Sequence, residues 1–105
     1  MAKARLVLVT APNEKEAKTI ARKVVEKKLA ACVNIVSRLS SVYRWEGDVQ
    51  EDAEVLMLIK TTKKRLEKLE KLVKKLHCYD VPELVVLKIE GGSSEYMKWL
   101  QKSVK

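Results

Sequence analysis

The stretch RLVLVTAPNEKEAKTIARKV, residues 5–24, contains a complete strand–helix unit and decides the fold. Arg5–Thr10 is a short apolar run rich in β-branched side chains, which predicts a strand that ends at the proline just beyond it. Asn13 can then cap a helix while Glu16 reaches back from the third helical position, as in a capping box. The helix should end near Lys28, and its apolar stripe follows the helical period: Ala17, Ile20, Ala21 and Val24.

A hairpin is predicted next along the chain. Ala31–Trp45 is rich in β-branched residues and has no helical stripe, which predicts a long strand bent or interrupted around Ser37–Ser41. Glu46–Asp48, with its central glycine, predicts the turn. The return strand ends in VLMLIK, Val55–Lys60.

The remaining chain repeats the strand–helix pattern. Thr61 or Thr62 is predicted to cap a second helix, and its inward-facing residues should be Leu66, Leu69, Leu72, Val73 and Leu76. Leu84–Glu90 predicts a strand, because the residue before the preceding proline favours an extended conformation. After a Gly-Gly turn, Ser93 or Ser94 should cap a last helix, whose stripe is Tyr96, Trp99, Leu100 and Val104.

The predicted order is β-α-β-β-α-β-α, which contains two split β-α-β units. Right-handed crossovers place both connecting helices on one face of a four-stranded antiparallel sheet. The sequence therefore predicts an α+β, ferredoxin-like fold with an extended hairpin and a C-terminal helix. At 105 residues, the chain is predicted to form one domain over residues 1–105.

The predicted strands are apolar on both faces. Odd and even positions alike are apolar in LVLV, VLMLI and LVVL, a pattern typical of strands buried on two sides. Because the helices cover one face, self-association is the simplest way to cover the other. The long strand would span roughly 50 Å if extended, whereas a domain of this size is only about 35 Å wide, so the hairpin should overhang onto a neighbouring subunit.

The composition narrows the class of protein. The formal charge is +8, but acidic and basic residues alternate at helical spacing over Lys63–Lys75, as on a solvated helix face, so nucleic acid is not a predicted partner. No apolar run approaches a membrane span and no secretory signal is evident, which predicts a cytoplasmic protein with reduced cysteines and no membrane partner. Only four Asn and Gln accompany the many Lys and Glu, a balance that favours a thermostable protein.

Six spaced motifs together resemble the CutA family of divalent-cation tolerance proteins. The resemblance is collinear and covers nearly the whole chain. It implies a cytoplasmic homotrimer of ferredoxin-like subunits linked to tolerance of copper and other divalent metals, structurally similar to the PII signalling proteins. It brings no established reaction and no obligatory cofactor. The motifs are TAP (Thr10–Pro12), KLAACVN (Lys28–Asn34), YRWEG (Tyr43–Gly47), IKT (Ile59–Thr61), HCYDVPE (His77–Glu83) and YMKW (Tyr96–Trp99).

His77, Cys78 and Cys32 are the candidate metal ligands, because imidazole binds copper and zinc and thiolates select soft ions. In an extended segment His77 and Cys78 would point in opposite directions, so they are not expected to chelate one ion together. Relatives with proposed copper ligands carry a cysteine and a second histidine where this chain has Val9 and Leu76, so His77 alone matches them.

Structural interpretations of these residues stay open. His77 ends a helix, where an imidazolium suits the negative end of the macrodipole. Cys32 lies in an apolar strand and could be a small buried hydrophobe, and so could Cys78.

A second hypothesis concerns a ligand cleft between subunits. Polar and amphipathic residues gather at the predicted strand ends, where the family motifs also concentrate. Aromatic residues there could equally be interface anchors. The predicted cleft contains His77 together with Trp45, Glu54, Lys60, Tyr79 and Glu83.

Other functional classes have less support. A catalysed reaction is not predicted, because no nucleophile–base pair stands out beyond Cys78 beside His77. Gly91–Ser94 could seat a phosphate, although a turn followed by a helix cap explains the same residues. An RNA-recognition module would need stacking aromatics on its central strands, which Leu6–Val9 and Val55–Ile59 lack. The retained alternative is a PII-like trimeric sensor of a small anion or nucleotide.

Overall fold

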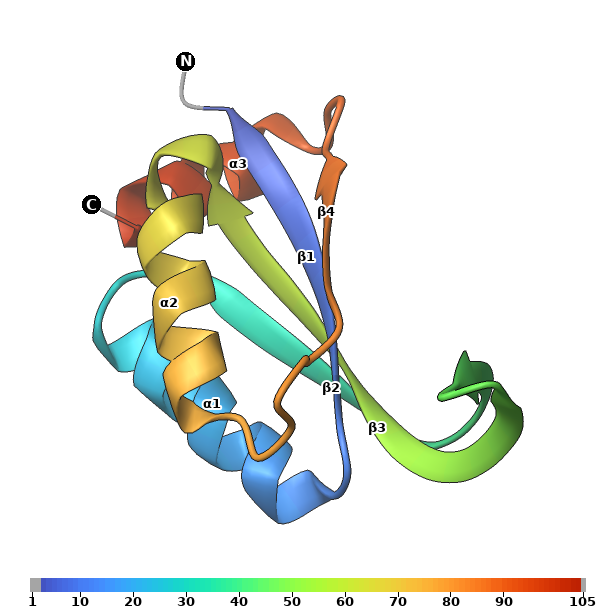
Figure 1. The fold of residues 1–105 in the computed structure, drawn as a ribbon. Coiled ribbons are helices and arrows are strands. Elements are labelled where there is room, and N and C mark those ends of the chain that lie inside the picture. The colour runs from blue at the N-terminus through green and yellow to red at the C-terminus, as the bar shows by residue number, and fades with distance from the viewer. Residues whose placement is uncertain (1–2, 105) are drawn as a thin grey trace.

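The computed structural model describes residues 3–104 and confirms the ferredoxin-like prediction (Figure 1). Its sheet is antiparallel, with strand order β2-β3-β1-β4. The elements in chain order are β1 (Ala4–Ala11), α1 (Glu14–Glu26), β2 (Cys32–Trp45), β3 (Asp48–Thr62), the short 3-10 helix η1 (Lys63–Arg65), α2 (Leu66–Leu76), β4 (Leu84–Lys88) and α3 (Ser94–Ser103).

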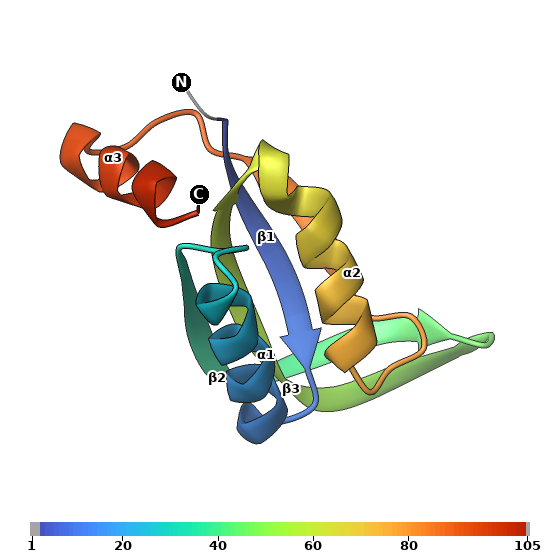
Figure 2. The same cartoon turned by 90° about the vertical axis from the view of Figure 1, so that its left-hand side faces the viewer.

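Helices α1 and α2 lie side by side on one face of the sheet (Figure 2). The main core fills the space between them and the odd-numbered residues of β1 and β3, as alternation along a strand requires. Each fully buried aliphatic side chain contributes about 1.5–3 kcal/mol relative to exposure. The fully buried side chains of this layer include Val7, Val9, Met57, Ile59, Ile20, Val24, Leu69 and Val73.

The start of α1 follows only half of its predicted capping box. The Asn13 side chain accepts a hydrogen bond from the Glu16 backbone N–H at 2.9 Å, which confirms the cap. The carboxylate of Glu16 does not return to Asn13 but accepts a hydrogen bond from the backbone of Cys78, beyond α2. A tertiary contact therefore replaces the local one.

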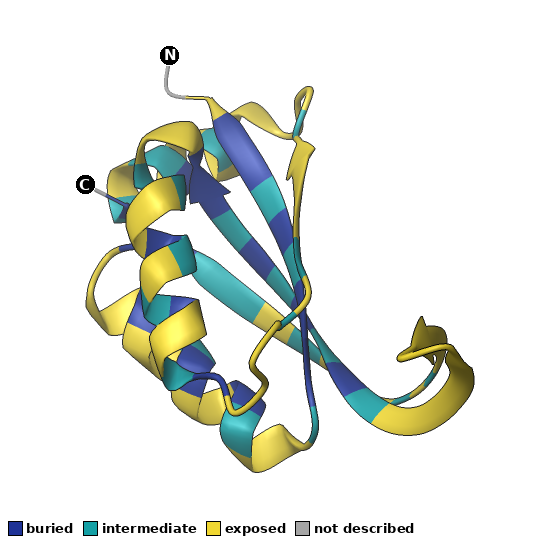
Figure 3. Ribbon diagram, in the orientation of Figure 1, coloured by how far each residue is buried: buried dark blue, intermediate teal, exposed yellow. Residues whose placement is uncertain are grey.

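The β2–β3 hairpin is the long arm that the sequence predicts. It turns at Glu46 and Gly47, with φ of 51° and 85°, the left-handed pair that a two-residue hairpin loop requires. Its register shifts between Val36 and Leu39, where Arg38 adopts a φ of 61°, so the predicted interruption is a bulge. The distal part of this arm, residues 42–53, is exposed (Figure 3), and the chain measures 44 Å along its longest axis.

Two helix predictions need correction. Thr62 precedes η1 but makes no side-chain cap bond, and the Thr61 hydroxyl donates to the Leu29 carbonyl at 2.7 Å, so neither threonine caps the second helix. Ser93 does cap α3. The predicted stripe of α3 is wrong in part, because Leu100 and Val104 are buried whereas Tyr96 and Trp99 are exposed. The buried stripe is completed by Met97.

The second face of the sheet is apolar, as the strand pattern predicts, and we call it the open face. Its half-buried and exposed aliphatic residues are Leu6, Leu8, Val36, Leu56, Leu58, Val85 and Leu87. Val36, Val85 and Leu87 keep 42%, 46% and 44% of their surface exposed in the single chain. Helix α3 reaches one end of this face, where the Tyr96 hydroxyl lies 3.4 Å from Lys60 Nζ.

Candidate metal site

His77 lies at the C-cap of α2, and its ring is held by backbone groups on both sides. Its Nε2 lies 2.7 Å from the Thr10 carbonyl, which can only accept, so Nε2 carries a proton and donates. Its Nδ1 accepts a hydrogen bond from the Tyr79 backbone N–H at 3.1 Å. The ring is therefore the neutral Nε2–H tautomer, and its side chain is fully buried.

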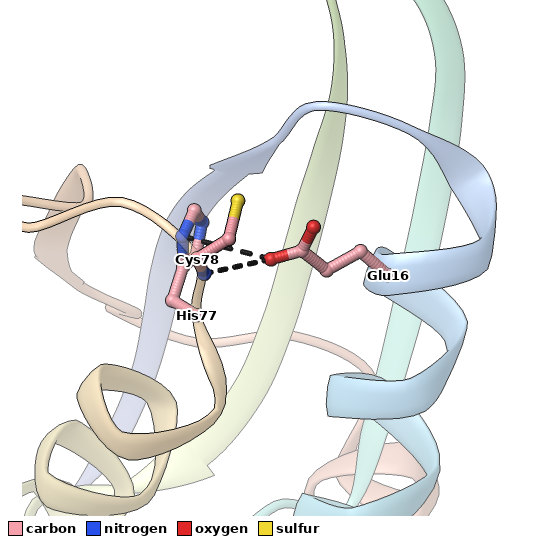
Figure 4. Close-up of side chains that lie close together, drawn as sticks. All are labelled: Glu16, His77 and Cys78. Atoms are coloured by element: carbon pink, nitrogen blue, oxygen red, sulfur yellow. Dashed lines mark hydrogen bonds and ion pairs between the residues drawn. The ribbon is translucent and has the colours of Figure 1, made fainter.

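Glu16 reaches the same place from the first turn of α1 (Figure 4). Its Oε1 accepts a hydrogen bond from the Cys78 backbone N–H at 2.8 Å and lies 3.9 Å from His77 Nδ1. This carboxylate joins α1 to the end of α2, and its charge faces the lone pair of the imidazole.

The three side chains form a compact set of donors. One nitrogen of His77, one oxygen of Glu16 and the sulfur of Cys78 all lie within 4.8 Å of one another. The prediction that His77 and Cys78 point apart is wrong, because the chain bends after His77 instead of continuing as a strand.

The donor chemistry of this set fits a divalent transition-metal ion. Imidazole, thiolate and carboxylate are all zinc ligands, and soft sulfur also favours copper. Tetrahedral zinc ligands lie roughly 3.5 Å apart, so the three side chains would need to move closer by small rotamer changes. The Thr10 carbonyl already fixes the tautomer, as outer partners of metal-bound histidines do. Nδ1 must first release the Tyr79 N–H.

The thiol of Cys78 is held in its protonated form. The hydrogen bond to the Glu16 carboxylate raises the pKa of Cys78, and burial and the carboxylate charge add to the effect. A metal ion must therefore displace a proton to gain this ligand.

Cys32 lies elsewhere. It pairs with Lys60 in the sheet, and Lys60 pairs with Leu6. Leu6 is four residues from Thr10 on β1, which corresponds to about 13 Å. The Cys32 thiol lies 3.6 Å from Asn34 Oδ1 and 3.8 Å from the Tyr96 hydroxyl. The chain thus brings Cys78 to His77 but does not bring Cys32 there.

The predicted cleft residues fall into separate groups within one chain. Tyr79 lies beside the ring of His77, with centroids 4.7 Å apart, and its hydroxyl donates to Glu54 at 3.2 Å. Burial, followed by the charge of Glu54, raises the pKa of Tyr79 to about 12. Glu83 is exposed just before β4.

The other cleft residues lie farther away. Lys60 donates to Asn34 at 2.9 Å and to Tyr96 at 3.4 Å, six residues along β3 from Glu54. Trp45 is 50% exposed at the hairpin tip.

Sequence reasoning missed Glu16, Asn34 and Tyr96 as site residues. Glu16 has a local explanation as a capping residue, and only the packing of α1 against the end of α2 brings it to Cys78. The β2–β3 register places Asn34 beside Lys60, and the position of α3 adds Tyr96. No pattern along the chain encodes these contacts.

Within residues 3–104, no helix is long and apolar enough to cross a membrane. The sequence model of the family described as "CutA1 divalent ion tolerance protein" matches residues 5–103. The "Divalent-cation tolerance protein CutA" of Thermus thermophilus is 53% identical over 98 residues, which cover 93% of this chain and 95% of that protein.

A plant relative and a solved structure extend the comparison. "Protein CutA, chloroplastic" of Arabidopsis thaliana is 50% identical over 95% of this chain, and the match covers 55% of that protein. The chain thus spans nearly all of the Thermus relative and about half the length of the plant and mammalian relatives. The crystal structure of CutA1 from Oryza sativa superposes with a TM-score of 0.96 at 47% identity, covering 99% of this chain and 95% of that one.

Proposed function

Because the chain belongs to the CutA1 divalent ion tolerance family, we propose that it serves divalent-cation tolerance by binding a transition-metal ion through Glu16, His77 and Cys78. One observation carries this proposal: three donor atoms of different chemistry lie within 4.8 Å of one another. Copper and zinc are the ions that this set suits best.

The site is built for reversible binding. The Nδ1 lone pair of His77 exchanges the Tyr79 N–H for the ion, and Cys78 gives up its thiol proton. Glu16 contributes a carboxylate that neutralises part of the ionic charge. Each exchange opposes binding, so the affinity should be lower than at a preformed structural site.

We also propose that the chain works as a homotrimer in the cytoplasm. The open face supports assembly, because a soluble monomer rarely exposes so large an apolar patch. The exposed aromatic residues of the β2–β3 arm, Tyr43 and Trp45, suit a subunit interface. The two free cysteines, Cys32 and Cys78, are consistent with a reducing compartment.

We propose no catalysed reaction. Both ring nitrogens of His77 are engaged by backbone groups, so the ring is not free to take a proton from the neighbouring thiol. The raised pKa of Cys78 also lowers the fraction of this thiol that is present as the nucleophilic thiolate.

Equilibrium dialysis of Zn(II) and Cu(I) against the native protein tests the metal proposal. His77→Ala and Cys78→Ser should each weaken binding at least tenfold, about the loss expected for a lost ligand or outer partner. Cys32→Ser is the matched control, because it removes a thiol outside the donor set, and its affinity should not change. Equal metal uptake by native protein and His77→Ala would overturn the assignment.

A second candidate function is the small-anion sensor. The observation that favours it is the ammonium group of Lys60, which lies on the open face with Asn34 and Tyr96 and would face a subunit cleft. If this site binds an anion, Lys60→Met should abolish the binding measured by calorimetry with inorganic phosphate, whereas Lys71→Met on α2 should not. Unchanged binding by Lys60→Met would reject this candidate.

A further inference from the structure

A hollow of about 590 Å³ lies at the end of β1 opposite to His77. The N-terminal end of β1, the end of β4 and the chain leading into α3 meet there, at the top of Figure 1. Four of its lining residues are cationic and one, Glu90, is acidic, which leaves an excess of three positive charges. We call it the basic hollow, and its charged residues are Lys3, Arg5, Lys88, Lys98 and Glu90.

The cations of the basic hollow outnumber the carboxylates that line it. Across the described residues 3–104, none of the four forms an ion pair with a carboxylate. Three lysines of α1 and α2 differ, because Lys18, Lys71 and Lys74 each pair with a glutamate four residues away. What distinguishes the basic hollow is that four cations and only one carboxylate line the same cavity.

Two of these cations oppose each other directly. Arg5 on β1 and Lys88 on β4 are cross-strand partners, and like charges at such positions destabilise a sheet. Arg5 is only 8% exposed, and the side-chain hydrogen bond that its guanidinium makes goes to the carbonyl of its own neighbour, Ala4. A largely buried guanidinium without an acidic partner among the described residues is costly, so a bound anion would compensate its charge.

Helix α3 adds to the positive potential. It is ten residues long, begins beside the basic hollow with Ser94 among the lining residues, and directs the positive end of its dipole there. An added Cβ at Gly91 would meet no atom within 4 Å, so the backbone at this edge is open to a ligand.

We propose that the basic hollow binds a small phosphate-bearing molecule, held by Arg5, Lys88 and Lys98. Arginine and lysine are the usual phosphate-binding side chains, and the volume is that of a pocket for a small organic ligand. No aromatic ring lines the described part of the hollow. The lining residues other than the cations are Glu90, Gln101, the small residues Ala4, Gly91, Gly92 and Ser94, and the apolar residues Ile89 and Met97. Recognition therefore rests on phosphate charge. This site lies apart from the metal donors and does not depend on them.

Calorimetry with inorganic pyrophosphate, on native protein in a metal-free buffer with chelator, tests the proposal. The native protein should bind, and the double variant Lys88→Met, Lys98→Met should bind at least about tenfold more weakly, because each charge-assisted hydrogen bond is worth more than one factor of ten. Methionine keeps the aliphatic stem and removes only the charge. Binding should also weaken as salt is added.

Two matched variants make the result specific. Lys71→Met and Lys74→Met each remove one charge from α2, outside the basic hollow, so both should bind pyrophosphate like the native protein. Circular dichroism confirms that each variant is folded before titration. The proposal is overturned if native protein shows no binding, if the double variant binds as tightly as native protein, or if either control loses as much affinity as the double variant.

Discussion

The two ends of β1 differ in whether their buried polar side chains have partners within the described chain. At the Thr10 end, the buried ring of His77 has a hydrogen-bond partner on each side, and Glu16 accepts a hydrogen bond from the Cys78 backbone. At the Arg5 end, a buried guanidinium faces Lys88 and lacks an acidic partner in the described chain. The first end is complete without a ligand, and a metal ion must compete with existing bonds there. The second end has an excess of positive charge, and a bound anion would balance it.

The largest expected effect on stability comes from a substitution at the Thr10 end of β1. His77→Ala removes a fully buried ring and leaves the Thr10 carbonyl and the Tyr79 N–H without partners. Loss of burial and of two hydrogen bonds should lower the free energy of unfolding by about 3 kcal/mol. Urea denaturation at one fixed protein concentration measures this free energy of unfolding.

Cys78→Ser is the control for this measurement. It keeps the backbone N–H that donates a hydrogen bond to Glu16, and it changes only an exposed side chain. It should change the unfolding free energy by less than about 0.5 kcal/mol. If His77→Ala costs no more than Cys78→Ser, the joint does not stabilise the fold in the way described.

The second prediction concerns the thiol at the same end. Glu16→Gln removes the charge that contributes to the raised pKa of Cys78, so this pKa should fall toward its ordinary value. More thiolate is then present at pH 8, and iodoacetamide should alkylate Cys78 several-fold faster. Mass spectrometry follows the rate, with Cys32 as an internal reference. An unchanged rate ratio of Cys78 to Cys32 would mean that Glu16 does not control the thiol.

The third prediction uses the pH dependence of Tyr79. Its pKa of about 12 in the folded chain lies above the ordinary value of 10.0, first through burial and then through Glu54. The unfolded chain therefore loses the tyrosine proton at lower pH than the folded chain, and the stabilisation, complete below pH 10, is lost as pH rises toward 12. Glu54→Gln should shift the ultraviolet titration of Tyr79 to lower pH. An identical titration in the variant would contradict the Glu54 contribution.

The sequence predicts those features that depend on neighbours along the chain. The caps at Asn13 and Ser93 and the turn at Glu46-Gly47 follow from local hydrogen bonding and backbone preference, and the structure confirms them. The alternation of strands and helices sets the order of elements, and the two-faced apolar pattern predicts the open face.

The contacts that make the sites are not local. Glu16 meets Cys78 across 62 residues, and its position in the first turn of α1 already has a sufficient local explanation. Arg5 meets Lys88 only through the β1–β4 register, which a shift of one residue would change. Tyr96 leaves the predicted stripe because Met97 and Leu100 take the buried positions on α3. Such contacts depend on packing angle and register, which periodicity does not specify.

The smallest expected effect is a gain in stability, opposite in sign to the loss expected for His77→Ala. Lys88→Met removes the charge opposite Arg5, and relief of like-charge repulsion should raise the free energy of unfolding by about 0.5 kcal/mol in ligand-free, low-salt buffer. The gain should shrink as salt screens the native pair. Lys71→Met is the control, because Lys71 pairs with Glu67 and its loss should lower stability slightly or leave it unchanged. If Lys88→Met is destabilising at low salt, Arg5 and Lys88 do not repel each other, and the contrast between the two ends of β1 loses its electrostatic basis.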